Sequence, residues 1–141
     1  MRQILIVKGK PKAKGRPRAA VVTGKDGNQR IVNYTPKKTR TWEDIIRWTW
    51  ISEKRKKLKG KIRLDVYFYF SIPKSYSRSK RVELGTSYYD KKPDIDNLIK
   101  TVMDALNDLA FDDDKQVVIL VASKFYIDGD PYTEIVLMEE K

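Results

Sequence analysis

The stretch from Lys61 to Ser71 alternates between apolar and polar side chains, and this alternation constrains the fold more than any other sequence feature. One side of the stretch carries Ile62, Leu64, Val66, Phe68 and Phe70, and the other carries Arg63, Asp65, Tyr67 and Tyr69. Because successive strand residues point to opposite faces, the pattern predicts a strand with one buried face. Such a strand needs a sheet around it and another layer packed on its apolar side.

The other segments of the chain supply that sheet and that layer. Further strands are predicted at residues 2–7, in a hairpin over 19–35, at 116–126 and at 132–138. One helix is predicted from Thr41 to about Lys57, opened by a capping box, and a long loop over 73–93. A second helix begins near Asp94, and its expected buried stripe is Ile95, Leu98, Ile99, Val102, Met103 and Leu106. We therefore expect a single α+β domain over residues 1–141, with two main helices packed on a small mixed β-sheet.

Composition narrows the chemistry that is open to the chain. The 141 residues include no cysteine and no histidine. The first absence excludes disulfides, a thiol nucleophile and cysteine-ligated zinc. The second excludes a Ser-His-Asp triad, histidine-dependent nucleases and histidine-ligated metals. Any chemistry on phosphates must therefore use carboxylates, lysines and a hard cation.

The charge balance favours a polyanionic partner. Thirty lysines and arginines against 19 aspartates and glutamates give a net charge of +11, which fits nucleic acid better than a merely solvated surface. The N-terminal residues show no signal-peptide pattern, and no run approaches the roughly 18 apolar residues of a membrane span. We expect a soluble cytoplasmic protein with no membrane partner.

A basic arm follows the first predicted strand. Its cations occupy every second position: Lys8, Lys10, Lys12, Lys14, Arg16 and Arg18. The prolines and glycines between them disfavour a helix, and alternate residues of an extended chain share a face. The arm is predicted to contact a row of DNA phosphates, with a flexible basic loop as the alternative.

The run from Asp94 to Lys100, with the sequence DIDNLIK, is the most informative segment. Pro93 disfavours a helical conformation at Lys92, so the helix should begin near Asp94, with that residue at or beside the N-cap. Asp96 then lies in the first turn, and Lys100 follows four residues later on the same face.

A second acidic group follows this helix in the turn over 112–114. It returns Asp114 to the helix start if strand 116–126 pairs beside the strand that precedes the helix. Three converging aspartates would repel one another unless a cation lay among them, and Mg²⁺ prefers such oxygen ligands. Helix caps and a solvated turn are the alternatives to a metal site.

Two other metal motifs can be compared with the same residues. An EF-hand loop from Asp94 needs glycine at its sixth position and glutamate at its twelfth, where this chain has Ile99 and Ala105. That motif is therefore excluded. A PD-(D/E)xK nuclease would use Asp94 with Asp113 and Lys115, but the second half of that motif normally lies on a strand rather than in a turn. It is a distant alternative.

These residues resemble the RusA family of Holliday junction resolvases, found in bacteria and their phages and prophages. The main match comprises DIDNLIK at 94–100, DAL at 104–106, Phe111 and DDKQVV at 113–118. A second match comprises GKP at 9–11, KGRPR at 14–18 and YTP at 34–36 with Lys38 and Thr39. Together the matches touch nearly the whole chain in the family's order.

The resemblance implies an activity and a role for each residue. It implies that Asp94, Asp96 and Asp114 bind Mg²⁺, with Mn²⁺ as an alternative ion, and that Lys100 is the catalytic lysine. Lys91 and Lys92 would add DNA contacts just before the first aspartate. The implied activity is that of a crossover junction endodeoxyribonuclease, a homodimer that makes paired symmetric nicks in four-way junctions during DNA recombination and repair. The implied source is a bacterial cell, with a phage or prophage gene as one origin.

Two further functions are compatible with the sequence. One is a metal-dependent nuclease acting on flaps or other branched DNA. The other is a non-catalytic protein whose basic charge serves only phosphate contacts. The three aspartates argue against the second function, because a protein that only binds DNA gains nothing from acids among its cations.

Overall fold

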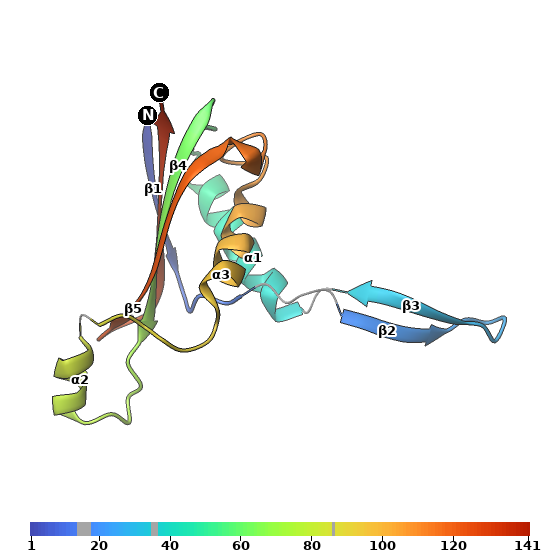
Figure 1. The fold of residues 1–141 in the computed structure, drawn as a ribbon, viewed down its shortest axis with the longest axis horizontal. Coiled ribbons are helices and arrows are strands. Elements are labelled where there is room, and N and C mark those ends of the chain that lie inside the picture. Colours follow the sequence, from blue (N-terminus) through green and yellow to red (C-terminus); the bar gives the residue numbers. More distant parts are fainter. Residues whose placement is uncertain (14–17, 35–36, 86) are drawn as a thin grey trace.

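A four-stranded mixed sheet forms the body of the molecule, and a two-stranded hairpin extends away from it (Figure 1). The computed structural model describes residues 1–13, 18–34, 37–85 and 87–141. The strands are β1 (Arg2–Lys8), β2 (Arg18–Thr23), β3 (Gln29–Tyr34), β4 (Lys61–Ser71), β5 (Val117–Ile127) and β6 (Tyr132–Glu140). The helices are α1 (Lys37–Ser52), α2 (Arg78–Leu84) and α3 (Ile95–Leu106), with a short 3₁₀ helix, η1, at Asp114–Gln116.

The strand order in the sheet is β1-β6-β4-β5. β6 pairs antiparallel with both β1 and β4, whereas β5 pairs parallel with β4. Two parallel strands must be joined by a long crossover connection. The crossover from β4 to β5 contains α3. The strand before α3 and the strand after it, β4 and β5, are therefore neighbours in the sheet. The predicted return of the acidic turn towards the helix required this pairing.

The core lies between one face of the sheet and the helices α1 and α3, which cover that face together (Figure 1). The apolar side of β4 is buried as predicted. Trp42, Ile46 and Trp50 recur at helical spacing on α1 and are also buried. Fully burying one such large apolar side chain contributes about 1.5–3 kcal/mol. The sequence therefore predicted the α+β class and the two main helices correctly.

The predicted hairpin is also confirmed. β2 and β3 pair antiparallel from Arg18 with Tyr34 to Thr23 with Gln29. The turn between them closes with a hydrogen bond of 2.8 Å from the Gly24 N–H to the Asn28 carbonyl. This hairpin lies away from the main sheet in Figure 1, so it shares no strand pairing with the core.

Several local predictions were wrong. α1 begins at Lys37 and ends at Ser52, so Thr41 lies inside the helix and not at its start. The helix stops early because Lys54 adopts the left-handed conformation, with φ 52°, that commonly ends helices. The segment predicted as a loop contains the short helix α2, whose first turn is capped by the hydroxyl of Ser77, which accepts the N–H of Lys80. Ile95, assigned to the buried stripe of α3, is 37% exposed because it lies at the helix start, beyond the edge of the core.

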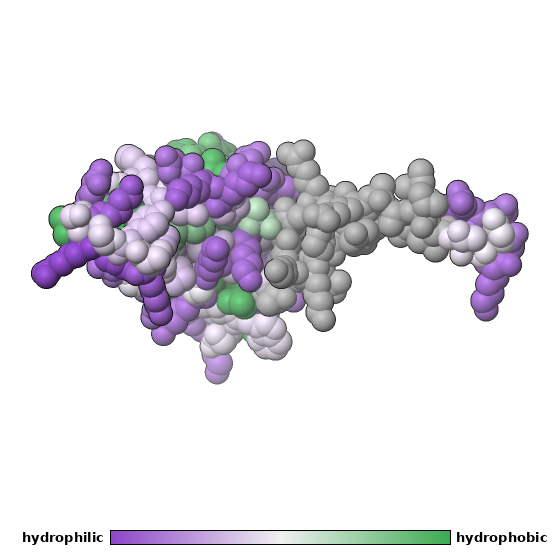
Figure 2. All heavy atoms as spheres, turned by 90° about the horizontal axis from the view of Figure 1, so that it is seen from below, coloured by the Kyte–Doolittle hydropathy of each residue, from purple (hydrophilic) through white to green (hydrophobic). Residues whose placement is uncertain are grey.

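The surface agrees with the strongly basic composition. The face drawn in Figure 2 is mostly hydrophilic, and its hydrophobic residues form small separate patches. Within the described ranges, no helix combines the length and apolar character that crossing a membrane would require.

Candidate active site

The N-terminal turn of α3 presents two exposed carboxylates. Asp94 is the N-cap residue, and its carbonyl accepts the N–H of Leu98 at 3.1 Å. Its carboxylate forms no capping hydrogen bond within the described turn, and the carboxylate of Asp96 accepts the N–H of Asn97 at 2.9 Å. The positive end of the helix dipole favours ionised groups here. Because an ionised carboxylate has about four acceptor sites, both groups keep capacity for a ligand.

Lys124 fixes the segment that leads into Asp94. From β5, its ammonium donates hydrogen bonds to the carbonyls at both ends of the Lys91–Pro93 segment, at 2.7 and 2.8 Å. The hydroxyl of Tyr89 donates to the carbonyl between them at 3.1 Å. Three successive carbonyls are therefore held from the strand and from Tyr89, and the strand sets the position of the first aspartate.

A first hollow joins the basic arm to this helix start. It has a volume of about 550 Å³, and its walls include Lys10 and Lys12 from the arm, Lys92 and Asp94. The three ammonium groups and the carboxylate come from segments about 80 residues apart in the sequence. This hollow is the place where cations that could bind phosphates lie beside a candidate metal ligand.

A second hollow opens on the other side of Asp94. It has a volume of about 510 Å³ and is lined by Asp94, Asp96, Tyr88, Tyr89 and Lys124, among others. Both predicted aspartates of α3 therefore border the same open space. A group bound there would touch carboxylate oxygens, an ammonium and aromatic rings.

The structure describes most of the other residues that were predicted to contact DNA. Three of them are exposed lysines: Lys8 at the end of β1, Lys91 and Lys92. Lys91 donates a hydrogen bond of 3.1 Å to the hydroxyl of Tyr76, which raises the pKa of its ammonium. Arg18 is the first residue of β2, whereas Lys14 and Arg16 lie outside the described residues.

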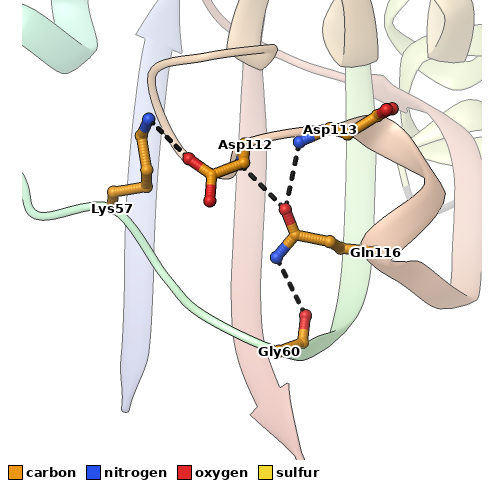
Figure 3. Close-up of polar contacts among 5 residues, drawn as sticks. All are labelled: Lys57, Gly60, Asp112, Asp113 and Gln116. Atoms are coloured by element: carbon orange, nitrogen blue, oxygen red, sulfur yellow. Dashed lines mark hydrogen bonds and ion pairs between the residues drawn. The ribbon is translucent and has the colours of Figure 1, made fainter.

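Gln116 organises the acidic turn that follows α3 (Figure 3). Its Oε1 accepts the N–H of Asp112 at 2.9 Å and that of Asp113 at 3.0 Å. Its Nε2 donates to the carbonyl of Gly60 at 3.0 Å. The ammonium of Lys57 pairs with the carboxylate of Asp112 at 2.9 Å. The turn is therefore anchored to the chain that enters β4.

The carboxylates of Asp113 and Asp114 interact directly. A hydrogen bond from the backbone N–H of Lys115, followed by one from the Asp114 carboxyl, lowers the pKa of Asp113. The pKa of Asp114 is raised, first by the hydrogen bond it shares with Asp113, then by a small loss of solvation and by the negative charges of Asp113 and Asp104. Crowded carboxylates of this kind favour a proton or a cation among them.

The sequence is similar to known proteins along nearly its whole length. The sequence matches the family described as "Endodeoxyribonuclease RusA" over residues 8–138. The chain belongs to the RusA family. A Bacillus subtilis (strain 168) protein named "Uncharacterized protein YqaN" is 37% identical over 139 residues, which cover 94% of this chain and 93% of that protein. RusA proteins are endodeoxyribonucleases, so the resemblance noted in the sequence is confirmed and the chain is a nuclease by family.

The structure unites the predicted RusA ligands only in part. Asp94 and Asp96 border one hollow, whereas Asp114 lies within the electrostatic influence of Asp104. Asp96 and Asp104 are eight residues apart on α3, which is about 12 Å along the helix axis. Lys100 lies midway on the same face. The assignment of Asp94, Asp96, Asp114 and Lys100 to catalysis therefore stays a prediction.

The donor chemistry of these RusA carboxylates fits a hard divalent cation. The candidate ligands are carboxylate oxygens, which Mg²⁺ prefers, and they are exposed enough to leave room for water and phosphate. The pKa of Asp114 is raised, first by its hydrogen bond with Asp113, so two carboxyl groups of this turn lie next to each other. As placed here, no three acidic side chains of the described residues stand close enough together to hold an ion.

Sequence reasoning missed several residues of the site. The roles of Lys124, Tyr88, Tyr89 and Gln116 all depend on contacts between distant segments. One signal was present: Lys124 lies opposite Phe68 in the parallel register, so a lysine occupies a position that faces the core side of the sheet. A charged residue at such a position indicates a specific polar partner.

Proposed function

We propose that this RusA-family protein is a Mg²⁺-dependent, structure-selective endonuclease that resolves four-way DNA junctions by paired symmetric nicks. It serves DNA recombination and repair in the cytoplasm of a bacterial cell, encoded by the host or by a prophage. Mn²⁺ is the alternative ion.

The hollow shared by Lys10, Lys12, Lys92 and Asp94 is the observation that carries this proposal. Three lysines around one space attract phosphates, since phosphate contacts supply most of the affinity for DNA. A carboxylate in the same wall repels phosphate and weakens simple binding. Its presence there is explained if it holds a cation that contacts the bound strand. A protein that only binds DNA has no such need.

Each residue of the site has a distinct role in the proposal. Asp94, Asp96 and Asp114 hold Mg²⁺, and Asp104 supports Asp114. When bound, Mg²⁺ supplies neutralisation of the phosphate and a water of lowered pKa. Lys100 donates hydrogen bonds to a phosphate oxygen as negative charge develops there. The lysines of the arm bind the flanking phosphates, and they orient the strand for cutting.

The proposed assembly is a homodimer. A four-way junction offers two equivalent strands, and a two-fold dimer presents an equivalent site to each. β5 is an edge strand of the sheet, and Val118, Ile119 and Leu120 are exposed on it. Exposed apolar edge strands tend to pair with another chain. Sedimentation equilibrium over a range of concentrations tests the dimer, and a monomer at concentrations that give paired nicks would contradict it.

The central experiment compares the cutting of a four-way junction, a flap and a linear duplex in Mg²⁺. Wild type is tested beside Asp96→Asn and beside the matched control Asp90→Asn, which makes the same charge change at an exposed residue before the helix. We expect paired nicks in the junction from wild type and from Asp90→Asn, and none from Asp96→Asn. Junction binding by Asp96→Asn should be unchanged or stronger, because a negative charge near the phosphates is removed.

Other outcomes assign other functions. Cutting of flaps in preference to junctions would replace junction resolution with a broader nuclease activity on branched DNA. Binding of the junction without cutting, in both Mg²⁺ and Mn²⁺, would refute the catalytic proposal. The protein would then be assigned as a basic DNA-binding protein.

A further inference from the structure

Tyr88 holds its aromatic ring out into solvent from a fixed backbone. Its side chain is 73% exposed. Its backbone forms an antiparallel bridge with Phe125, and on either side Ser87 and Tyr89 hydrogen-bond to β5 at 3.0 and 2.9 Å. The exposed ring is therefore carried by the edge of the sheet and not by a free loop.

A stack of rings supports Tyr88 from behind. Its ring stacks on that of Phe125, with centroids 5.2 Å apart and planes 26° apart. Phe125 stacks in turn on Tyr69 at 5.5 Å, and Tyr69 stacks on Tyr132 at 4.5 Å. One face of Tyr88 is occupied by this stack, and the exposure of the residue leaves the other face open. Such a held ring loses little conformational freedom when another planar group stacks on it.

The open face belongs to the second hollow of the candidate site. Tyr88 lines that hollow together with Asp94, Asp96 and Lys124. Its neighbour Tyr89 is packed inward instead, stacked on Phe70 with ring centroids 4.0 Å apart. Tyr89 therefore packs within the fold, whereas Tyr88 faces the space beside the aspartates.

We propose that Tyr88 is a stacking platform for an unpaired nucleobase of the nucleotide next to the cleaved phosphate. Every base offers a π-face to an aromatic ring, and such stacking tolerates any sequence. Lys124 and the arm lysines supply cationic contacts for the adjoining phosphates. The proposal rests on the nuclease function above and adds a residue that selects the structure of the DNA.

Stacking on Tyr88 gives a physical basis for choosing branched DNA. In a linear duplex each base is already stacked on its neighbours and paired, so its face becomes available only at the cost of unstacking and unpairing the base. At a branch point the continuous stacking of the duplex is interrupted, so that cost is lower. Phosphate contacts, by contrast, do not touch the bases and so do not report whether a base is stacked. Tyr88 should therefore affect junctions more than duplexes.

The test uses the full-length protein without divalent metal, so that DNA is bound but not cut. Wild type, Tyr88→Phe, Tyr88→Ala and the control Trp48→Ala are compared. Trp48 is an exposed aromatic residue on α1 that does not line the hollow, with 69% of its surface accessible. The probes are a four-way junction with 2-aminopurine beside the branch point and a linear duplex of the same sequence. Affinity for each DNA and fluorescence of the complex are measured.

We expect Tyr88→Ala to weaken junction binding by about 5- to 150-fold, the range of one base stacked on an aromatic ring, and to leave duplex binding unchanged. Its junction complex should also fluoresce more brightly than that of wild type, because stacking quenches 2-aminopurine. Tyr88→Phe keeps the ring and should match wild type, as should Trp48→Ala.

Two results would overturn the proposal. One is an unchanged ratio of junction to duplex affinity in Tyr88→Ala. The other is a changed oligomeric state of that variant in sedimentation, which would assign the ring to a protein interface. In either case wild type that still makes paired nicks in Mg²⁺ leaves the nuclease function standing. If wild type makes none, the nuclease function itself fails, and the stacking proposal, which rests on it, falls too.

Discussion

The side-chain amide of Gln116 donates a hydrogen bond of 3.0 Å to the backbone carbonyl of Gly60. These residues lie 56 positions apart, one just after the acidic turn and the other just before β4. The same amide accepts two backbone N–H groups of the turn (Figure 3). The orientation of Asp114, which is in that turn, therefore depends on a side chain whose amide bonds to the protein's own backbone. Gln116 is a positioning residue.

Replacing Gln116 with alanine should raise the Mg²⁺ concentration needed for half-maximal cutting by about 10- to 100-fold, as is typical when a residue that orients a metal ligand is lost. Saturating Mg²⁺ should restore most of the rate. The measurement is junction cutting over a series of Mg²⁺ concentrations. Gln29→Ala, at an exposed position in the hairpin, is the matched control and should follow the wild-type curve. An unshifted curve for Gln116→Ala would mean that the turn is held by other contacts.

Lys124→Met should destabilise the fold and reduce cutting together. The substitution removes the charged donor of two hydrogen bonds, and each bond to a charged group contributes about 1.5–3 kcal/mol. We expect the free energy of unfolding in urea to fall by about 1.5–3 kcal/mol, because the side chain is half-buried and water recovers part of the loss. Lys61→Met, at an exposed position of β4, should change stability by less than about 0.5 kcal/mol. Equal effects of the two substitutions would show that the hydrogen bonds from Lys124 to the Lys91–Pro93 segment do not form in solution.

The fold was predictable where a single period dominated a segment. The alternation in β4 and the helical stripe of α3 each predicted the type of element and its buried face. They did so because the spacing of apolar residues shows directly which face is buried. Helix α1 was predicted with the wrong limits, since its first turn starts before the apolar stripe. The short helix α2 was missed because it contributes no buried residue and so leaves no periodic signal.

The site was predictable only for residues grouped in the sequence. Asp94, Asp96 and Lys100 lie within seven residues, so their shared helix start could be inferred from Pro93 and the spacing. Residues that act across the fold could not be inferred in this way. Lys124 reaches a segment 31 positions earlier, and Gln116 reaches one 56 positions earlier. Such contacts depend on strand register, which local patterns do not fix.

The tryptophans of α1 give a direct test of the packing. Trp42 is 2% exposed and contacts the core, whereas Trp48 on the same helix is 69% exposed. Trp42→Ala should lower the free energy of unfolding by about 3–5 kcal/mol, because it leaves a large cavity. Trp48→Ala should change it by less than about 0.5 kcal/mol. Chemical denaturation followed by circular dichroism measures both, and a large loss for Trp48→Ala would show that its exposed face is covered by another chain.

The basic arm should contribute to DNA binding through charge alone. Lys10 and Lys12 line the hollow beside Asp94, and each cation that neutralises a phosphate contributes about 0.9 to the slope of log affinity against log salt. The double variant Lys10→Gln, Lys12→Gln should therefore lower that slope by about 1.8 for any duplex sequence.

The control makes the same charge change in Lys54→Gln, Lys56→Gln, just after α1 and outside the hollow, and should keep the wild-type slope. The slope is measured by fluorescence anisotropy over a salt series without divalent metal. Equal reductions in the two double variants would mean that the arm adds only to the general charge of the surface, and the hollow would then not be the place where the strand is held.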